Sequence, residues 1–202
     1  MTGTKAEILA AARDLFLERG LDGVSMRAVA ERVGVSATAI YRHYRDKKEL
    51  LAATVADGFE LFRRSLAQAL RRPTPRERLL ATGERYLRFA FEHPRYYQVL
   101  FMAWEELGLL DLPRPSPGQL SPGLRFLVDR VDECAAAGLL RAPTDPLQTA
   151  LLFWAEVHGL ASLWLAGGGR EHVGEVRYRA LARGALRQLV DGLLLPETGE
   201  AR

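Results

Sequence analysis

Side chains that can hydrogen-bond to nucleic acid recur on one side of a short segment, at Thr38, Tyr41 and Arg42. A guanidinium group can pair with a guanine edge or a phosphate, and a tyrosine hydroxyl can donate to a phosphate. A helix turns by about 100° per residue, which places Thr38 and Arg42 opposite Ile40. The opposite, inner face consists of Ala37, Ile40 and Tyr44. The outer face therefore has the chemistry of a helix that reads the major groove of DNA.

The surroundings of this segment also suit a polyanion. Residues 37–39 are small, and small side chains let a helix backbone approach base edges. Lys47 follows Asp46, which can cap the next helix and leave backbone donors and an ammonium group directed at an anion. The other nearby cations are Arg27, Arg45 and Lys48. We expect these groups to bind phosphates, and we expect salt to weaken the binding.

Two helices joined by a tight turn must position these side chains, and the first helix has clear signals at both ends. Ser25 can cap its N-terminus by accepting from the free backbone donors of the first turn. Val24 and Val29 have the spacing of a hydrophobic staple around this cap. Gly34 can adopt the left-handed conformation that ends a helix without Cβ strain.

The second helix repeats these signals at once. Ser36 can act as its N-cap, and Val35 with Ile40 forms a second staple at the same offsets. Two caps, two staples and one glycine within about twenty residues predict a helix-turn-helix over residues 25–44.

The stretch from about Thr4 to Val55 resembles the N-terminal domain of TetR-family transcriptional regulators. The matching residues are Ala12, Leu15, Phe16, Gly20, Met26-Arg27-Ala28-Val29-Ala30, Val33-Gly34-Val35-Ser36, Ile40-Tyr41, His43-Tyr44 and Lys47-Lys48-Glu49-Leu50. The resemblance implies a DNA-binding domain in roughly the first quarter of the chain.

The resemblance also implies contacts residue by residue. Arg27 matches a position that often touches DNA, and Lys47 matches a phosphate-binding lysine. His43 matches a phosphate-contacting position, although its place at the edge of the inner face fits a packed, hydrogen-bonded histidine nearly as well. The predicted DNA-binding residues are Ser25, Arg27, Ser36, Ala37, Thr38, Tyr41, Arg42, His43, Arg45 and Lys47.

Composition agrees with a folded, intracellular regulator. The 202 residues are 48% hydrophobic with a net charge of +3, so the chain can bury a sizeable core. The single cysteine, Cys134, excludes an internal disulfide and a cysteine metal cluster, and we expect no metal or cofactor. The charged N-terminal segment predicts no signal peptide and a cytoplasmic location. DNA affinity is expected from a local cluster of cations: Arg27, Arg32, Arg42, Arg45, Lys47 and Lys48.

Beyond Val55 apolar residues recur every three or four positions, which predicts helices and no strands. The predicted helices span residues 46–70, 76–92, 96–101, 124–137, 146–166 and 174–194, with a loop at 105–123. We therefore predict an all-α fold, with an N-terminal three-helix helix-turn-helix domain and a C-terminal helical bundle for dimerisation and ligand binding. The predicted domains are residues 2–62 and 63–202.

The helix predicted at 146–166 is apolar nearly all round. Glu156 and His158 near its middle argue against a membrane span, so the helix must be buried on several sides. We predict a twofold homodimer in which this helix and the last one pack against their symmetry mates as a four-helix bundle.

The same helix carries the order W-x-x-x-H-G at Trp154, His158 and Gly159, which resembles the signature of one C-terminal subclass of TetR-family regulators. The preceding segment 93–97 is compatible with that subclass. Trp154 and His158 are four residues apart and share a helix face, whereas Gly159 would permit close helix approach. The alternative is that all three residues only pack.

Regulators of this family respond to a small molecule bound in the C-terminal body. The residues that could line such a cavity are Phe89, Tyr97, Phe101, Trp104, Phe126, Cys134, Trp154 and His158. The alternative for most of them is ordinary core packing. His158 or Tyr97 would orient the ligand, because each places a polar group in an apolar pocket.

Three functions remain open at this point. The first is a repressor that binds a palindromic, double-stranded operator as a dimer and is released by a small apolar effector. The second is a DNA-binding architectural or partner-recruiting protein without an effector. The third is a helical enzyme or carrier with a surface helix-turn-helix. An enzyme of this kind could use Glu156 and His158, but these residues are two apart and do not share a helix face.

Sequence motifs of enzymes argue further against the third function. The chain has no H-E-x-x-H, G-x-S-x-G or P-loop pattern, and its histidines lack metal-ligand spacing. The triple glycine at 167–169 follows a predicted helix rather than a strand, so we interpret it as a C-cap and loop.

Overall fold

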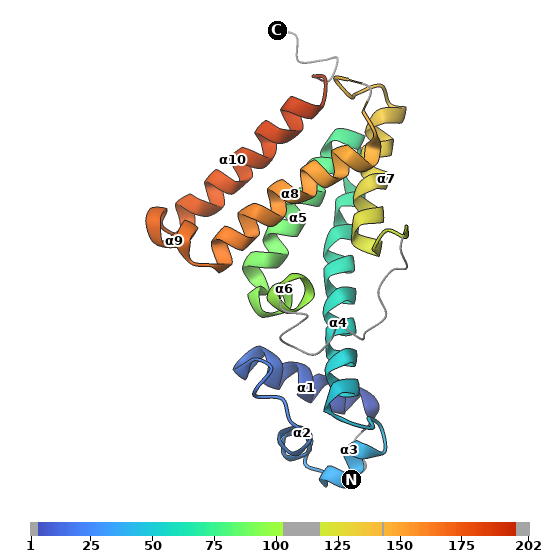
Figure 1. Ribbon diagram of the computed structural model, residues 1–202, viewed down its shortest axis with the longest axis vertical. Helices are drawn as coiled ribbons and strands as arrows, with labels where there is room; N and C mark the ends of the chain where they lie inside the picture. The colour runs from blue at the N-terminus through green and yellow to red at the C-terminus, as the bar shows by residue number, and fades with distance from the viewer. Residues whose placement is uncertain (1–3, 103–117, 143, 197–202) are drawn as a thin grey trace. The chain divides into compact units, whose positions relative to one another are not determined.

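The computed structural model describes residues 4–102, 118–142 and 144–196. Within these residues the chain forms α-helices and one 3₁₀ turn, and its only β pairing is an isolated bridge between Leu140 and Leu194 (Figure 1). The all-α prediction is confirmed. No helix in the described part of the chain has the length and apolar character needed to cross a membrane.

The chain divides into two compact units by its internal contacts: Met1–Leu61 with His93–Pro113, and Phe62–Glu92 with Arg114–Arg202. The predicted functional division into residues 2–62 and 63–202 remains a prediction. The division by internal contacts assigns His93–Pro113 to the first unit, although this segment directly follows helix α5 (Pro75–Glu92) of the second unit.

The first unit is built on the N-terminal helices. It contains α1 (Lys5–Arg19), α2 (Met26–Val33), α3 (Ala37–Tyr41), the first part of α4 (Lys47–Ala67) and α6 (Pro94–Phe101). Helix α2 packs against both α1 and α3. The core of this unit is apolar and fully enclosed, and its members include Ile8, Leu15, Phe16, Val24, Val29, Ile40, Tyr44 and Leu50.

Local signals begin and end the first helix of this unit. Thr4 accepts from the backbone N–H of Glu7, and the Glu7 carboxylate accepts from the backbone N–H of Thr4, so the two residues form a capping box. The helix ends at Gly20, whose φ of 73° is costly for residues with a Cβ.

Aromatic and polar contacts attach α6 to the same unit. The rings of Phe16 and Tyr96 lie 5.3 Å apart, and Arg95 donates to the backbone carbonyl of Phe16 at 3.2 Å. A Cβ built on Gly58 would lie 2.5 Å from the Tyr96 ring, so the absence of a side chain lets α4 accept this ring.

The second unit is a bundle of longer helices. Its elements are the 3₁₀ turn η1 (Gln68–Arg71), α5 (Pro75–Glu92), α7 (Pro122–Ala136), α8 (Pro146–Leu165), α9 (Gly168–Val173) and α10 (Glu175–Leu193). Helix α5 contacts α7, α8 and α10, which makes it the central element of this bundle. A Cβ on Gly83 of α5 would lie 2.6 Å from Leu186 and 2.8 Å from Phe153, so this glycine permits close packing.

The observed helix boundaries agree with the predicted ones where a capping residue marks the end of a helix, and they differ where no cap was identified. Asp145 caps α8 through the backbone N–H of Leu147 at 2.9 Å, as its position before Pro146 predicts. The helix predicted at 46–70 ends as α4 at Ala67 and continues as the 3₁₀ turn.

Two loop predictions need comment. The interpretation of residues 167–169 as cap and loop was wrong beyond Gly167, because Gly168 and Gly169 already belong to α9. Gly167, with φ 84°, lets the chain leave α8 and re-enter a helix at once. The loop predicted at 105–123 lies mostly outside the described residues, and its end is shorter than expected because Ser121 caps α7 through Leu124.

Candidate nucleic-acid interface and helical body

Both predicted caps of the helix-turn-helix are present. Ser25 Oγ accepts from the backbone N–H of Ala28 at 3.1 Å, and Ser36 Oγ accepts from that of Ala39 at 3.3 Å. Between them Gly34 adopts the left-handed conformation with φ 77° and ψ 32° and ends α2. The path of the chain from α2 into α3 is therefore set by three short-range signals.

Helix α3 is shorter than the sequence suggested. Regular α-helix ends at Tyr41 rather than near Tyr44. The backbone N–H groups of His43 and Tyr44 both bond to the carbonyl of Ile40, at 2.9 and 3.0 Å. Two donors that converge on one carbonyl tighten the turn and end the α pattern.

The two faces of α3 differ in exposure. Thr38 and Arg42 are exposed and Tyr41 is 54% exposed, whereas Ile40 and Tyr44 are almost completely enclosed. Ala37, which the helical angle assigned to the inner face, is exposed instead. It is the first helical residue, and its side chain tilts toward the N-terminus and so beyond the end of the helix. The buried side chains of Ile40 and Tyr44 anchor α3, so the polar side chains of this helix face outward.

Two arginines of α2 have acidic partners. Arg27 pairs with Glu31 at 3.1 Å on an open surface, where such a pair is weak and readily exchanged for a phosphate. Arg32 donates twice to Glu18, at 2.9 and 2.6 Å, and joins α2 to α1. Hydrogen bonding from Arg32 lowers the pKa of Glu18. Arg32 was counted among the cations that attract DNA, and this role remains a prediction beside its helix–helix contact.

The start of α4 is fixed by reciprocal hydrogen bonds. Asp46 accepts from the backbone N–H of Glu49, and the Glu49 carboxylate accepts from that of Arg45, both at 2.8 Å. The Lys47 ammonium donates to the backbone carbonyl of Leu21 at 3.4 Å. All predicted DNA-binding residues are exposed apart from His43, which is half-buried, and their roles in binding remain predictions.

In the second unit a hydrogen-bond network joins α5 to α8. The Tyr86 hydroxyl lies 3.0 Å from Nδ1 of His158, and Nε1 of Trp154 donates to the same hydroxyl at 3.1 Å. An indole N–H can only donate, so the hydroxyl accepts this bond. The direction of the second bond depends on the histidine tautomer: a neutral imidazole with its proton on Nε2 accepts at Nδ1, and one with its proton on Nδ1 donates. Burial lowers the pKa of His158 and so favours the neutral imidazole.

Sequence reasoning missed Tyr86, although it is 6% exposed and links the two residues of the W-x-x-x-H-G signature. Its ring also packs edge-on against Phe62 at 5.5 Å. No local pattern marks it, because its hydrogen-bond partners lie 68 and 72 residues away. Gly159 was expected to permit close helix approach, but a Cβ built on it would have no atom of the described residues within 4 Å.

The other predicted ligand-binding residues are divided between the units. Tyr97 and Phe101 lie together in the first unit with ring centroids 4.9 Å apart. The members in the second unit are Phe89, Phe126, Cys134, Trp154 and His158. Trp104 lies outside the described residues. Their contact with a ligand remains a prediction.

Cys134 is fully enclosed within α7 and the surrounding bundle. Burial raises the pKa of its thiol to about 11, so the thiol is neutral at physiological pH. In the described part of the chain no group of three or more His, Cys, Asp or Glu side chains is placed to hold a metal ion.

Known families match both parts of the chain. Residues 8–54 match the family described as "Bacterial regulatory proteins, tetR family". Residues 79–189, more than half of the chain, match the family described as "Tetracyclin repressor-like, C-terminal domain". The chain belongs to the TetR family of transcriptional regulators. This TetR-family protein is therefore a DNA-binding regulator with a helix-turn-helix domain.

Individual relatives of the TetR-family chain carry the same kind of name. It is 28% identical over 189 residues to the HTH-type transcriptional repressor KstR2 of Mycolicibacterium smegmatis, covering 90% of each chain. It is 32% identical over 98 residues to the HTH-type transcriptional activator FasR of the same organism, covering 48% of this chain and 45% of FasR. A solved TetR-family transcriptional regulator from Pectobacterium atrosepticum has a TM-score of 0.68 and 28% identity, covering 95% of this chain and 94% of that one.

Proposed function

We propose that this TetR-family regulator is a repressor that binds an inverted-repeat operator as a homodimer and is released by a small apolar effector. The observation that carries the proposal is the arrangement of α3, where Thr38, Tyr41 and Arg42 are exposed above a buried anchor. A short helix held rigidly at its inner face can enter a major groove without losing its packing.

The exposed side chains divide into two kinds of contact. Arg42 has the fork geometry that pairs with a guanine edge, and Thr38 and Tyr41 can contact neighbouring bases or phosphates. Ser25, Arg45 and Lys47 lie on the same domain with donors that suit the phosphate backbone. Base contacts would supply specificity, whereas phosphate contacts would fix the register of the protein on the duplex.

The proposed dimer rests on apolar side chains that the chain leaves uncovered. On α8, Leu152 and Leu163 are 53% and 57% exposed and share an outward face with Gly159. On α10, Leu181 is 54% exposed, and no described atom lies within 4 Å of a Cβ built on Gly184. Large exposed leucines beside open glycines suit close packing against a second copy.

The direction of regulation is proposed from the relatives. The named repressor KstR2 aligns over nearly the whole chain, whereas the named activator FasR aligns over less than half of it. An apolar effector is proposed because aromatic rings lie beside the polar groups of Tyr86 and His158. The Phe62 ring packs against that of Tyr86 at 5.5 Å, and the Trp154 ring lies 5.8 Å from that of His158. Such a site orients a mostly apolar ligand through few polar contacts.

Selection of bound fragments from random DNA tests the repressor proposal directly. We expect an inverted repeat with half-sites about 34 to 36 Å apart, one helical turn. Arg42→Ala should weaken specific binding by roughly 1 to 3 kcal/mol and relax one base preference. Lys47→Ala should weaken binding to all DNA sequences equally. It should also reduce the slope of log binding constant against log salt concentration by about one. Fragments without an inverted repeat would contradict the proposal.

Sedimentation tests the dimer, and a ligand screen tests the effector. Leu163→Glu should produce monomers at micromolar concentration, because it places a charge in the proposed interface. The matched control is Leu70→Glu, which changes a leucine that is 47% exposed on η1, and it should leave the dimer intact. If no small apolar compound changes operator affinity, the architectural or partner-recruiting function replaces the effector proposal.

A further inference from the structure

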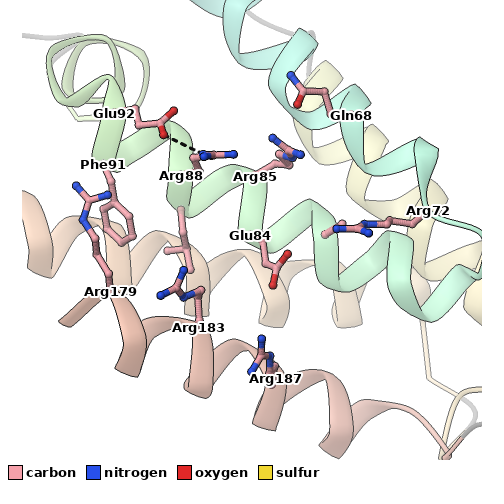
Figure 2. Close-up of a pocket in the computed structure, with 12 residues that line it drawn as sticks. Gln68, Arg72, Glu84, Arg85, Arg88, Phe91, Glu92, Arg179, Arg183 and Arg187 are labelled. Atoms are coloured by element: carbon pink, nitrogen blue, oxygen red, sulfur yellow. Dashed lines mark hydrogen bonds and ion pairs between the residues drawn. The ribbon is translucent and has the colours of Figure 1, made fainter. Parts of the chain in front are cut away.

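A cleft of about 430 Å³ between α5 and α10 has arginines as half of its twelve lining residues. Figure 2 shows Arg179, Arg183 and Arg187 along α10, opposite side chains of α5. The six arginines of the lining are Arg72, Arg85, Arg88, Arg179, Arg183 and Arg187. With two glutamates, the lining carries an excess of four positive charges, which is more than the net charge of +3 of the whole chain. The cleft lies entirely within the second unit.

Two of these arginines have acidic partners. Arg88 pairs with Glu92 at 2.9 Å, the one interaction drawn between the residues in Figure 2. Arg179 pairs with Glu175 at 2.8 Å and lies over the Phe91 ring at 5.0 Å. These contacts hold two guanidinium groups in place at one end of the cleft, where a ligand would meet a preformed surface.

The other four arginines of the cleft differ from this pair. In the described part of the chain, no ion pair is formed by the guanidinium groups of Arg72, Arg85, Arg183 and Arg187. On α10 the arginines recur every four residues, so successive members share a face about 6 Å apart along the axis. Unpaired like charges at this spacing repel one another, and a bound polyanion would remove that repulsion.

The floor of the cleft strengthens this preference. Ala81 and Leu87 line it and are 5% and 1% exposed, so one side of the cleft borders the apolar core. Charge–charge attraction is stronger beside such a low-dielectric wall than in open water. Guanidinium groups also bind phosphate through two parallel hydrogen bonds, which lysine cannot do.

We propose that this cleft binds a small molecule that carries two or more phosphate groups. Its volume is in the range of small-molecule sites, and several guanidinium groups can share the oxygens of linked phosphates. The cleft is distinct from the apolar effector site proposed above. On α5, Arg88 is about 200° from Tyr86 around the helix axis, so the two sites use opposite faces. The inference does not depend on the proposed repressor function.

Calorimetry with inorganic pyrophosphate, using the full-length protein at fixed ionic strength, tests the proposal. We expect saturable binding that weakens roughly tenfold or more in the double variant Arg183→Gln with Arg187→Gln. Both side chains are exposed, so the substitutions should preserve the fold, which circular dichroism would verify. The matched control is Arg71→Gln with Arg125→Gln, which removes two exposed charges of the same unit outside the cleft and should leave pyrophosphate affinity unchanged.

Several results would overturn the proposal. One is the absence of saturable pyrophosphate binding, and another is an equal loss of affinity in the cleft variant and the control. Citrate binding as tightly as pyrophosphate would overturn the phosphate assignment. A loss of DNA affinity in the cleft variant with unchanged pyrophosphate binding would make the cleft a nucleic-acid surface instead.

Discussion

The helix-turn-helix and the Tyr86 network are held together over very different sequence separations. Ser25 and Ser36 cap their helices through residues only three positions away. Tyr86 meets Trp154 and His158 across 68 and 72 residues. The caps of the first region depend on local spacing, whereas the Tyr86 network exists only after α5 and α8 have packed. Substitutions in the two regions should therefore differ in how far their effects spread.

The largest expected effect is from Ile40→Ala, because Ile40 is 0% exposed and anchors α3. Removing its buried methyl groups should lower the free energy of unfolding by about 2 to 5 kcal/mol. Hydrogen exchange should accelerate in α2 and α3 and stay unchanged in α5 and α8. Thr38→Ala is the control and should change stability by less than about 0.5 kcal/mol. Equal acceleration in both units would contradict the expectation that the effect is confined to the first unit.

Tyr86→Phe should have the next largest effect. It removes the hydroxyl that serves both Trp154 and His158, and we expect a loss of about 1 to 3 kcal/mol in the free energy of unfolding. Urea unfolding provides the measurement. Tyr41→Phe removes a hydroxyl from a side chain that is 54% exposed and should be nearly neutral. A neutral Tyr86→Phe would show that the network does not stabilise the bundle.

Ser36→Ala should cost about 1 kcal/mol, because it removes the oxygen that accepts from Ala39. Ser36→Asn keeps a capping oxygen and should restore most of the stability and the helicity of α3. Thermal unfolding of the two variants measures the difference. An equal loss of stability in Ser36→Ala and Ser36→Asn would mean that Ser36 does not stabilise α3 through its capping hydrogen bond.

The smallest expected effect is a pH dependence due to His158. Burial lowers its pKa in the folded protein, so the unfolded chain binds a proton where the folded protein does not. The contribution of neutral His158 to the free energy of unfolding should therefore be fully present above a pH of about 6.5. It should decrease as the pH falls toward the lowered pKa of the folded protein. Urea unfolding between pH 7 and 5 measures this slope. His158→Gln should flatten it, and an unchanged slope would assign the effect to other groups.

Residues with short-range partners were predictable and those with distant partners were not. The caps at Ser25, Ser36 and Asp145 were correct because each depends on a backbone donor two or three residues away. The pairing of Arg32 with Glu18 was not predicted, because the two residues are 14 positions apart and lie on different helices. The prediction that Ala37 lies on the inner face was wrong because it assumed a helix that continues in both directions. Helix α3 begins at this residue, so no preceding turn covers its side chain.

The arginine cleft was also not predictable from the sequence, because its residues come from two helices that are far apart along the chain. The four-residue spacing along α10 is visible in the sequence, but it is equally typical of an ordinary solvated face. Only the packing of α10 against α5 brings Arg85 and Arg88 opposite this row.

The sequence by itself determined that the chain is helical, where its helices are capped, and which family its N-terminal region resembles. These properties depend on hydrogen bonds and side-chain periodicity within one or two helical turns. The tertiary structure alone decided that Tyr86 joins Trp154 and His158, that Arg32 holds α1, and that the arginines of α5 and α10 share a cleft. Such contacts depend on the angles and offsets at which helices pack, and these are set by the whole core.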